Sequence, residues 1–281
     1  MARGRPVRIL LAGDTHRNLR HTLWLIDQAA DLRCASLFVL GDFAYRMDDG
    51  GQWFIQEVGD AAVDAGILVH WLDGNHDDHD WLDDVRADDC TDDDGFLVSG
   101  HVAVRYAHRG HRWTWGGLDF GALGGAHSVD QRHRLPHVSW WPQETITAAD
   151  VDRCLDGGPL DVLLTHDAPT ASPVAAVMAE RGRRYTDRPH TEANRRAVEQ
   201  VRRATTPGVV AHGHYHLRYT RRFADGGTSI GLGHDRQGHD SRVLFDTRHF
   251  DPAALRPPVQ HDDPQRTGCR DPGRDGVAVP R

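Results

Sequence analysis

Three short apolar segments early in the chain constrain its fold, because each one ends in a turn that contains glycine and a polar residue. The segments are residues 7–11, 36–40 and 67–72, and their turns contain Gly13-Asp14, Gly41-Asp42 and Gly74-Asn75. Apolar runs bounded by glycine, aspartate and asparagine are typical of buried strands. Helices are expected after the first two segments, over 19–30 and 53–65. This order favours βαβ units and a largely parallel sheet.

Further strand and helix signals follow toward the C-terminus. The β-type runs at 102–106, 113–115 and 118–120 are separated by glycine turns, and they predict antiparallel strands that enter a second sheet. The aspartate-rich stretch 77–94 is interpreted as a solvated loop with a short helix. The remaining expected elements are strands at 161–164, 208–211, 228–232 and 242–245, and helices at 147–155 and 191–204.

Length and composition favour one domain. A chain of 281 residues that is 39% hydrophobic can form one large α/β domain, which we expect over residues 1–250. Residues 251–281 are rich in Pro, Arg and Asp and poor in apolar side chains, and they are predicted to form a disordered tail. The chain has no run of 18 apolar residues and no signal-peptide pattern, so no membrane association is expected.

The net charge and the cysteine and histidine contents indicate which partners and which cellular compartment to expect. A formal net charge of −8 argues against a stable nucleic-acid partner. The four cysteines are widely spaced and form no Cys-x-x-Cys pair, which makes a cytoplasmic location the default expectation. The 20 histidines favour metal binding, although they also increase the number of accidental histidine motifs.

Ligand-type side chains follow five of the expected strands. In order along the chain they are Asp14 and His16, Asp42, Asn75 and His76, His166, and His214 and His216. In open α/β sheets, ligands bind at the carboxyl ends of the strands. A mixture of carboxylate, amide and imidazole groups suits a pair of borderline divalent cations such as Mn²⁺, Fe²⁺ or Zn²⁺ better than Mg²⁺ or Ca²⁺ alone.

The motifs differ in how specific they are. With 29 glycines and 20 histidines, Gly-His-x-His is expected by chance about 0.15 times in a chain of this length. Asparagine is rare, so Gly74-Asn75-His76-Asp77 is expected only about 0.003 times. Any one motif could be an ordinary turn, since Asp, Asn and Gly are common in loops. Their ordered occurrence after five strands favours a metal site instead.

The ordered set resembles the calcineurin-like metallophosphoesterases, in particular their bacterial and phage members. The similarity extends from about residue 8 to 220, and it is carried by Gly13-Asp14-Thr15-His16, Gly41-Asp42, Gly74-Asn75-His76-Asp77, His166 and Gly213-His214-Tyr215-His216. The resemblance implies a four-layer αββα sandwich with two mixed β-sheets. It also implies two divalent cations, Mn²⁺ first, with Fe²⁺, Zn²⁺ or Mg²⁺ as alternatives.

The resemblance also implies a role for each motif residue. Asp14, His16 and His216 would hold the first cation, whereas Asn75, His166 and His214 would hold the second and Asp42 would bridge both. His76 would face the substrate as a general acid or charge stabiliser, with Asp77 orienting its ring. His212 is outside this ligand set.

Candidate substrate-binding residues lie in two places. Arg46 could contact phosphate, although Tyr45 stands where the protein-phosphatase branch has an acidic residue. Residues 123–134 and Trp140-Trp141 resemble a segment that approaches the active site in bacterial and phage members. There, His127, Arg132 and Arg134 could bind phosphate and the tryptophans could stack on a base. The alternative is a buried tryptophan cluster beside a glycine-rich turn.

The sequence therefore predicts a dinuclear hydrolase of phosphomonoesters or phosphodiesters that uses metal-activated hydroxide. Its expected substrate is a phosphorylated small molecule or nucleotide. The alternatives are a nuclease or a protein Ser/Thr phosphatase of the same fold. A non-catalytic scaffold is disfavoured, because a scaffold would show gaps in the ligand set and this chain shows none.

Overall fold

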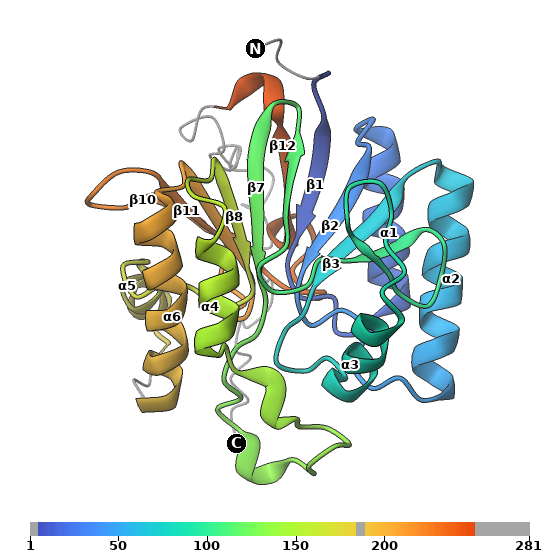
Figure 1. The fold of residues 1–281 in the computed structure, drawn as a ribbon, viewed down its shortest axis with the longest axis horizontal. Helices are drawn as coiled ribbons and strands as arrows, with labels where there is room; N and C mark the ends of the chain where they lie inside the picture. The colour runs from blue at the N-terminus through green and yellow to red at the C-terminus, as the bar shows by residue number, and fades with distance from the viewer. Residues whose placement is uncertain (1–4, 184–188, 251–281) are drawn as a thin grey trace, which may run out of the picture.

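The structure, a computed structural model, describes residues 5–183 and 189–250. Two six-stranded β-sheets stand face to face at the centre, with helices on both outer sides (Figure 1). The expected four-layer αββα sandwich is confirmed. The predicted tail at 251–281 lies outside the described residues.

The first sheet has the strand order β12–β1–β2–β3–β5–β4. Its strands β1, β2, β3 and β5 are parallel, and the edge strands β12 and β4 are antiparallel to their neighbours. The bounds are Arg8–Ala12 for β1, Ser36–Leu40 for β2, Leu68–Leu72 for β3, Leu97–Val98 for β4, Val104–Tyr106 for β5 and Arg242–Asp246 for β12.

The second sheet has the order β10–β11–β9–β8–β7–β6. It is also mixed, since only β10 and β6, at its two edges, run antiparallel to their neighbours. The bounds are Arg112–Trp115 for β6, Leu118–Leu123 for β7, Val162–Thr165 for β8, Val209–His212 for β9, Tyr219–Arg222 for β10 and Thr228–Gly231 for β11.

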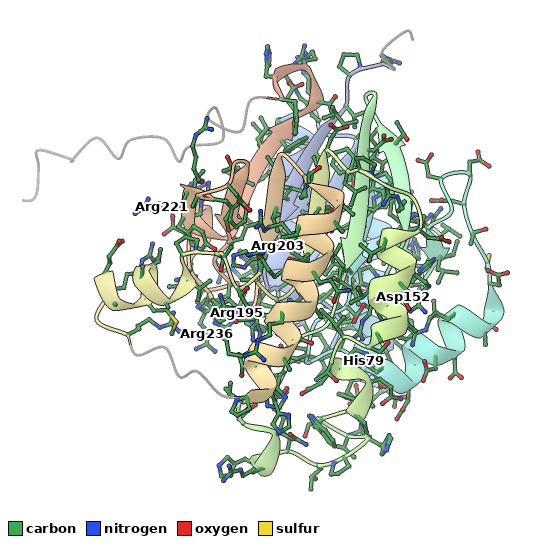
Figure 2. The ribbon with its side chains drawn as sticks, turned by 60° about the vertical axis from the view of Figure 1, so that its left-hand side comes forward. His79, Asp152, Arg195, Arg203, Arg221 and Arg236 are labelled. Carbon is green, nitrogen blue, oxygen red and sulfur yellow. The ribbon has the colours of Figure 1, made fainter. Side chains whose placement is uncertain are left out.

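Helices α1, α2 and α3 flank the first sheet, and α4, α5 and α6 lie on the side of the second (Figure 1). Figure 2 shows α6, with Arg195 and Arg203 along it, in front of the second sheet. The bounds are Leu19–Asp31 for α1, Asp49–Ala65 for α2, His79–Asp88 for α3, Ala148–Leu155 for α4, Val174–Glu180 for α5 and Pro189–Thr205 for α6. Among the described residues, no helix combines the length and apolar character that a membrane crossing requires.

Apolar clusters join the four layers, and three of them pack the sheets against each other and against α1, α2, α4 and α6. Alternate residues of each strand face opposite sides. Within β1, Leu10 packs in the cluster beneath α1 and α2, whereas Ile9 and Leu11 pack in the cluster between the two sheets. A third cluster joins β8 to α4 and α6 through residues such as Leu163 and Val201. The two sheets are thus held in a fixed relation, and so are the loops at their ends.

One strand expectation is wrong. The segment 102–106 was expected to enter the second sheet, but its core, β5, pairs with β3 in the first sheet in parallel register. A short run of alternating residues indicates a strand without specifying its partner, which depends on long-range packing. Strands β4 and β10 and helix α5 had no counterpart among the expected elements.

Candidate metal centre

The predicted ligand residues lie together at the carboxyl ends of five strands, of which β1, β2 and β3 are adjacent in the first sheet and β8 and β9 are adjacent in the second. The loop after β1 carries Asp14 and His16, and the loops after β2, β3, β8 and β9 carry Asp42, Asn75, His166, and His214 with His216. Asp14, Asp42, Asn75 and His166 are each no more than 3% exposed. Polar side chains buried to this extent need partners of opposite charge or hydrogen-bonding capacity.

Asp14, His16 and His216 form the first group of candidate ligands. The Nε2 atom of His216 is 3.0 Å from Oδ2 of Asp14, and Nε2 of His16 is 3.8 Å from the same oxygen. The ring centroids of His16 and His216 are 4.9 Å apart. Two imidazole nitrogens therefore converge on one carboxylate oxygen, and these are the three residues that the resemblance implied for the first cation.

Asp14, Asp42 and His166 form the second group, and a third group, His16 with His234 and Asp235, adjoins the first. The carboxylate of Asp42 lies between the two sides of the site. Its Oδ2 is 3.8 Å from Nε2 of His16, and its Oδ1 is 3.5 Å from Nε2 of His166. Each oxygen of Asp42 thus faces a different histidine, which is the arrangement that a bridging carboxylate requires.

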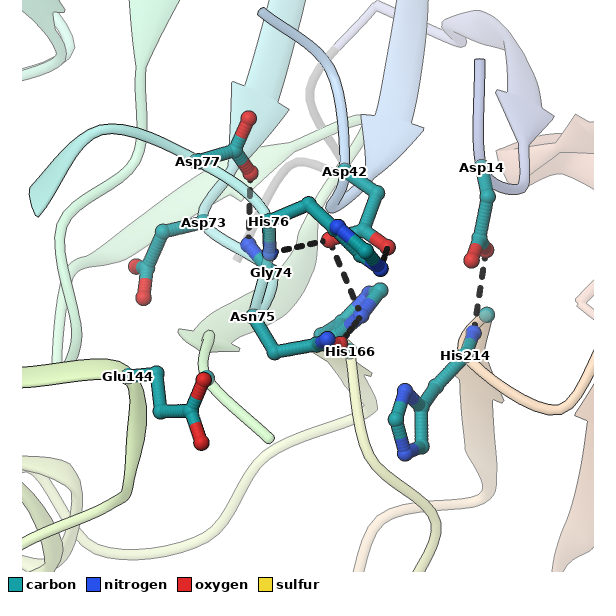
Figure 3. Close-up of polar contacts among 12 residues, drawn as sticks. Asp14, Asp42, Asp73, Gly74, Asn75, His76, Asp77, Glu144, His166 and His214 are labelled. Atoms are coloured by element: carbon teal, nitrogen blue, oxygen red, sulfur yellow. Dashed lines mark hydrogen bonds and ion pairs between the residues drawn. The ribbon is translucent and has the colours of Figure 1, made fainter. Parts of the chain in front are cut away.

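Hydrogen bonds orient His166 and Asn75 (Figure 3). The Nδ1 atom of His166 is 2.7 Å from the carbonyl oxygen of Leu40, so it carries a proton, and Nε2 is directed toward Oδ1 of Asn75 at 3.1 Å. The amide nitrogen of Asn75 donates to Oγ of Ser128, which donates to Glu144. Because the amide nitrogen is used in this way, the Asn75 oxygen is the atom that faces the site.

His214 lies beside the second group without belonging to it in the described structure. Its backbone N–H donates to Oδ1 of Asp14 at 2.9 Å, and its ring centroid is 5.1 Å from that of His166. Burial lowers the pKa of His214 to about 3, with the neighbouring His166 as the next cause. The ring is therefore neutral at physiological pH, which is the protonation state that binds a metal.

The charges of the buried acids are balanced by histidines. Burial acts to raise the pKa values of Asp14 and Asp42, but nearby histidines outweigh it and lower both. Burial acts to lower the pKa of His166, but Asp42 and Asp14 outweigh it and raise the pKa to about 8. Two ionised carboxylates are thus paired with a protonated His166. A divalent cation would take the place of that proton.

The motif glycines let the ligand side chains approach the backbone. A Cβ atom on Gly41, whose φ is +92°, would lie 2.1 Å from Nδ1 of His166. A Cβ atom on Gly74 would lie 2.2 Å from Oδ1 of Asp42. Contacts this close are incompatible with any side chain at either position. The donor set of carboxylate, amide and imidazole groups, held in these cradles, fits borderline divalent cations.

His76 lies at the margin of the centre, between the negative charge of Asp42 and the positive charge of Arg134. Its Nε2 is 3.8 Å from Oδ2 of Asp42, and the terminal nitrogens of Arg134 are 2.8 and 2.7 Å from Nδ1 and Nε2. Burial lowers the pKa of His76, Asp42 opposes this effect and Arg134 adds to it. His76 is not among the candidate ligand groups of the described residues.

The expected contact between Asp77 and the ring of His76 is not present in the described structure, and this corrects the expectation. The Asp77 carboxylate instead accepts hydrogen bonds from the backbone N–H groups of Gly74, Phe43 and Ala44 at 2.7, 2.9 and 2.9 Å. Asp77 therefore ties the loop after β3 to the loop after β2. The carboxylate is turned toward these amides because they are otherwise unpaired at the strand ends.

The predicted substrate-binding residues separate into two locations. Arg46 and Arg134 line one hollow of about 370 Å³ that also includes His76, Tyr45 and Trp141. His127 is not in the lining of that hollow; its Nδ1 is 3.6 Å from Glu144 and its ring is 5.3 Å from that of His190. Trp141 is 1% exposed, and its Nε1 donates to Asp80.

Several supporting residues were not among the sequence candidates. Ser128 and Glu144 orient Asn75, as described above. Asn194 donates to Asp167, next to His166, and Arg195 donates to the carbonyl groups of Ala168 and Pro169, so α6 holds the loop after β8. Ser128 lies within the segment 123–134 singled out in the sequence, whereas no sequence pattern marks Glu144, Asn194 or Arg195. Asp235 contacts His16 at 2.9 Å, and its place after the strand that ends at Gly231 is the signal that could have identified it.

The sequence matches the family described as calcineurin-like phosphoesterase over residues 7–218. Among solved structures, TT1561 of Thermus thermophilus is 14% identical, with a TM-score of 0.54 over 88% of this chain and 97% of that one. A dimetal phosphatase from Danio rerio is 12% identical, with a TM-score of 0.50 over 85% and 92%. At these identities the two structures demonstrate a shared fold only. No curated protein matches the sequence.

Proposed function

The chain belongs to the calcineurin-like phosphoesterase family, and from this premise we propose that it hydrolyses phosphomonoesters or phosphodiesters with the help of two divalent cations. Asp14, His16 and His216 would hold the first cation, and Asn75, His166 and His214 would hold the second. Asp42 would be shared by both. The observation that carries this assignment is the position of Asp42, whose two oxygens face His16 at 3.8 Å and His166 at 3.5 Å.

Two cations bound at this centre would supply positive charge to the phosphate oxygens and would lower the pKa of a water molecule. The protein's own residues have the remaining tasks. His166 is held by the carbonyl of Leu40 and Asn75 by Ser128, so both present their ligand atoms in one direction. Such preorganisation is the principal contribution of a protein to a reaction that depends on charge.

His76 is proposed to give a proton to the leaving group. Its ring is next to Arg134 and Asp42, and it lines the hollow in which a leaving group would lie. Burial, with Arg134 adding to its effect, lowers the pKa of His76 before substrate arrives. A bound phosphate attracts the guanidinium and adds negative charge beside the ring, and both changes favour the protonated imidazole.

A small or nucleotide-like substrate is supported by the size and lining of the hollow beside His76. Its volume of about 370 Å³ is in the range of small-molecule sites. Arg17, Arg46 and Arg134 line it together with Tyr45 and Trp141. Arginine suits phosphate oxygens because its planar guanidinium can donate two parallel hydrogen bonds. His127, which lies against Glu144, is retained as a candidate for substrate contact at the edge of the site.

The proposal is tested with protein that is stripped of metal and resupplied with Mn²⁺, Fe²⁺, Zn²⁺ or Mg²⁺ separately. We expect two ions per chain and metal-dependent hydrolysis of small phosphomonoesters or phosphodiesters, with Mn²⁺ giving the highest activity. The Asp42→Ala variant should lose most of both ions because Asp42 bridges them. At most one ion in folded, fully reconstituted wild-type protein would overturn the dinuclear assignment.

The same substrate panel separates the alternatives. Single-stranded and double-stranded nucleic acids test for a nuclease, and a phosphoserine peptide tests for a protein phosphatase. Activity confined to either one would replace the small-substrate proposal. Two bound ions with no activity on any ester would favour a non-catalytic scaffold.

A further inference from the structure

Asp235 connects the loop after β11 to the metal centre through its side chain and its backbone. Its Oδ1 is 2.9 Å from Nδ1 of His16 and 3.0 Å from Nδ1 of His234. Its Oδ2 accepts a hydrogen bond from the amide of Asn18 at 2.7 Å. The backbone N–H of Asp235 donates to the carbonyl of Asp14 at 2.9 Å. The loop is therefore fixed to the end of β1, next to the first group of candidate ligands.

The hydrogen bond to Asp235 determines which nitrogen of His16 can bind a cation. An ionised carboxylate can only accept hydrogen bonds, so the Nδ1 atom that faces it must carry the proton. In the neutral ring, Nε2 then carries the lone pair. That atom is 3.8 Å from Oδ2 of Asp14 and 3.8 Å from Oδ2 of Asp42. The lone pair is thus directed at the two carboxylates of the centre.

The same carboxylate also holds His234, which packs against another candidate ligand. The ring centroids of His234 and His216 are 4.3 Å apart, and those of His234 and His16 are 5.7 Å apart. Asp235 therefore restrains His16 directly and His216 through His234.

We propose that Asp235 is a positioning residue that fixes the tautomer and the ring direction of His16, and thereby sets the affinity of the first group for its cation. The inference rests on the proposed metal centre, but it concerns one of the two cations only. Carboxylates and carbonyls that accept the second ring proton of a metal-binding histidine typically contribute 10–100-fold, as an order of magnitude, to metal affinity.

Titration of the metal-free full-length protein with Co²⁺ alone tests the proposal, because the visible absorption of bound Co²⁺ reports its coordination. In the Asp235→Asn variant we expect one of the two ions to bind about 10–100-fold more weakly, with a changed absorption band, while the other binds as in wild type. The matched control is Asp240→Asn, which removes the same charge from the same loop and should leave both affinities unchanged.

A double-mutant comparison with His16 distinguishes positioning from general support of the fold. His16→Gln alone should weaken binding of the same ion, and adding Asp235→Asn should cause a much smaller loss than it causes in wild type, because the ring that Asp235 restrains directly is already absent. Losses that multiply in the double variant would overturn the proposal. Wild-type affinities and spectra in Asp235→Asn would overturn it as well. So would loss of the metal-free fold in both Asp235→Asn and Asp235→Ser, since the residue would then be structural.

The outcome also separates this inference from the proposed function. If wild-type protein binds no pair of cations, the proposed function fails at that point. If wild type binds two cations and hydrolyses phosphoesters while Asp235→Asn is unchanged in affinity and spectrum, the inference about Asp235 alone is wrong.

Discussion

His76 is the residue at which binding and proton transfer can be separated most directly. It contacts Asp42 on one side and Arg134 on the other, and it belongs to none of the three candidate ligand groups of the described residues. Its neighbour Asp77, by contrast, is committed to backbone amides. Adjacent residues of one motif therefore have different surroundings, since His76 lines the hollow beside the centre and Asp77 holds the loops.

Replacing His76 by alanine should leave both cations bound and lower kcat by roughly 10²–10⁴-fold, the usual contribution of a positioned proton donor. The loss should be smaller for esters with good leaving groups such as nitrophenolate, which need less protonation on departure. Kinetics with a series of leaving groups, together with elemental analysis, measure both effects.

His166→Ala is the control for this experiment. It should lose a cation and impair all substrates alike, because Nε2 of His166 faces Asp42 and Asn75 inside the centre. A uniform loss across the leaving-group series in His76→Ala, accompanied by metal depletion, would instead place His76 among the metal ligands.

At the scale of the elements, the loops at the strand ends decide whether the ligands meet. The turn after β2 shows why. Gly41 has a φ of +92°, and its missing side chain leaves the space in which the ring of His166 packs. The same ring donates from Nδ1 to the carbonyl of Leu40. The ring of His166, which follows β8 in the second sheet, thus packs against the end of β2 in the first sheet.

Replacing Gly41 by alanine should displace the His166 ring and lower cation content, since the new Cβ would lie 2.1 Å from Nδ1. Gly158→Ala is the matched control, because Gly158 also has a positive φ of +75° but no atom within 4 Å of a Cβ. We expect the control to lose about 1–2 kcal/mol of unfolding free energy from backbone strain alone and to keep its cations. Denaturant unfolding and elemental analysis test both variants. Equal metal content in Gly41→Ala and Gly158→Ala would contradict the steric argument.

At the scale of the whole molecule, the core between the sheets contains a titratable side chain. His70 on β3 is 2% exposed, hydrogen bonds with Ser36 at 2.7 Å, and packs against Phe38, Phe96 and Trp115. Burial lowers the pKa of His70 to about 3. The folded protein therefore keeps this ring neutral over a pH range in which an unfolded chain would protonate it.

Stability should consequently fall as the pH falls from about 6.5, the ordinary pKa of histidine, toward 3. In this window the unfolded state binds the proton and the folded state does not. Protonation of His70 in the unfolded state therefore lowers the free energy of unfolding by about 1.4 kcal/mol per pH unit. The His70→Gln variant should show a shallower decline between pH 6 and 4 in urea unfolding, whatever its stability at neutral pH. The exposed His239→Gln should keep the wild-type slope, and parallel curves for all three proteins would contradict the prediction.

The segment after Phe250 is predicted to be dispensable for catalysis because of its Pro-rich, apolar-poor composition. Truncation after this residue keeps the ring that packs against Phe245, at 6.1 Å between centroids. Turnover should stay within a few-fold of that of the full chain, as measured by steady-state kinetics. A collapse of activity in a truncated protein that remains folded would show that the segment takes part in the site.

Much of the sheet architecture could be predicted from the sequence because its signals are local. Apolar runs that end in glycine turns predicted the strands β1, β2, β3, β8 and β9 to within one or two residues. The resemblance supplied the four layers. The pairing of β5 with β3 could not be predicted, because a strand pattern specifies which faces are apolar and not which neighbour it joins.

The sequence by itself determined which residue types follow the strands, and parallel strands bring such residues to one edge within each sheet. Only the tertiary structure decided how they are oriented. Asp77 binds the amides of Phe43 and Ala44, Ser128 and Glu144 direct the amide of Asn75, and Asp235 faces Nδ1 of His16. These contacts join residues far apart in the chain. Their geometry depends on the packing of two sheets against each other, which no local pattern encodes.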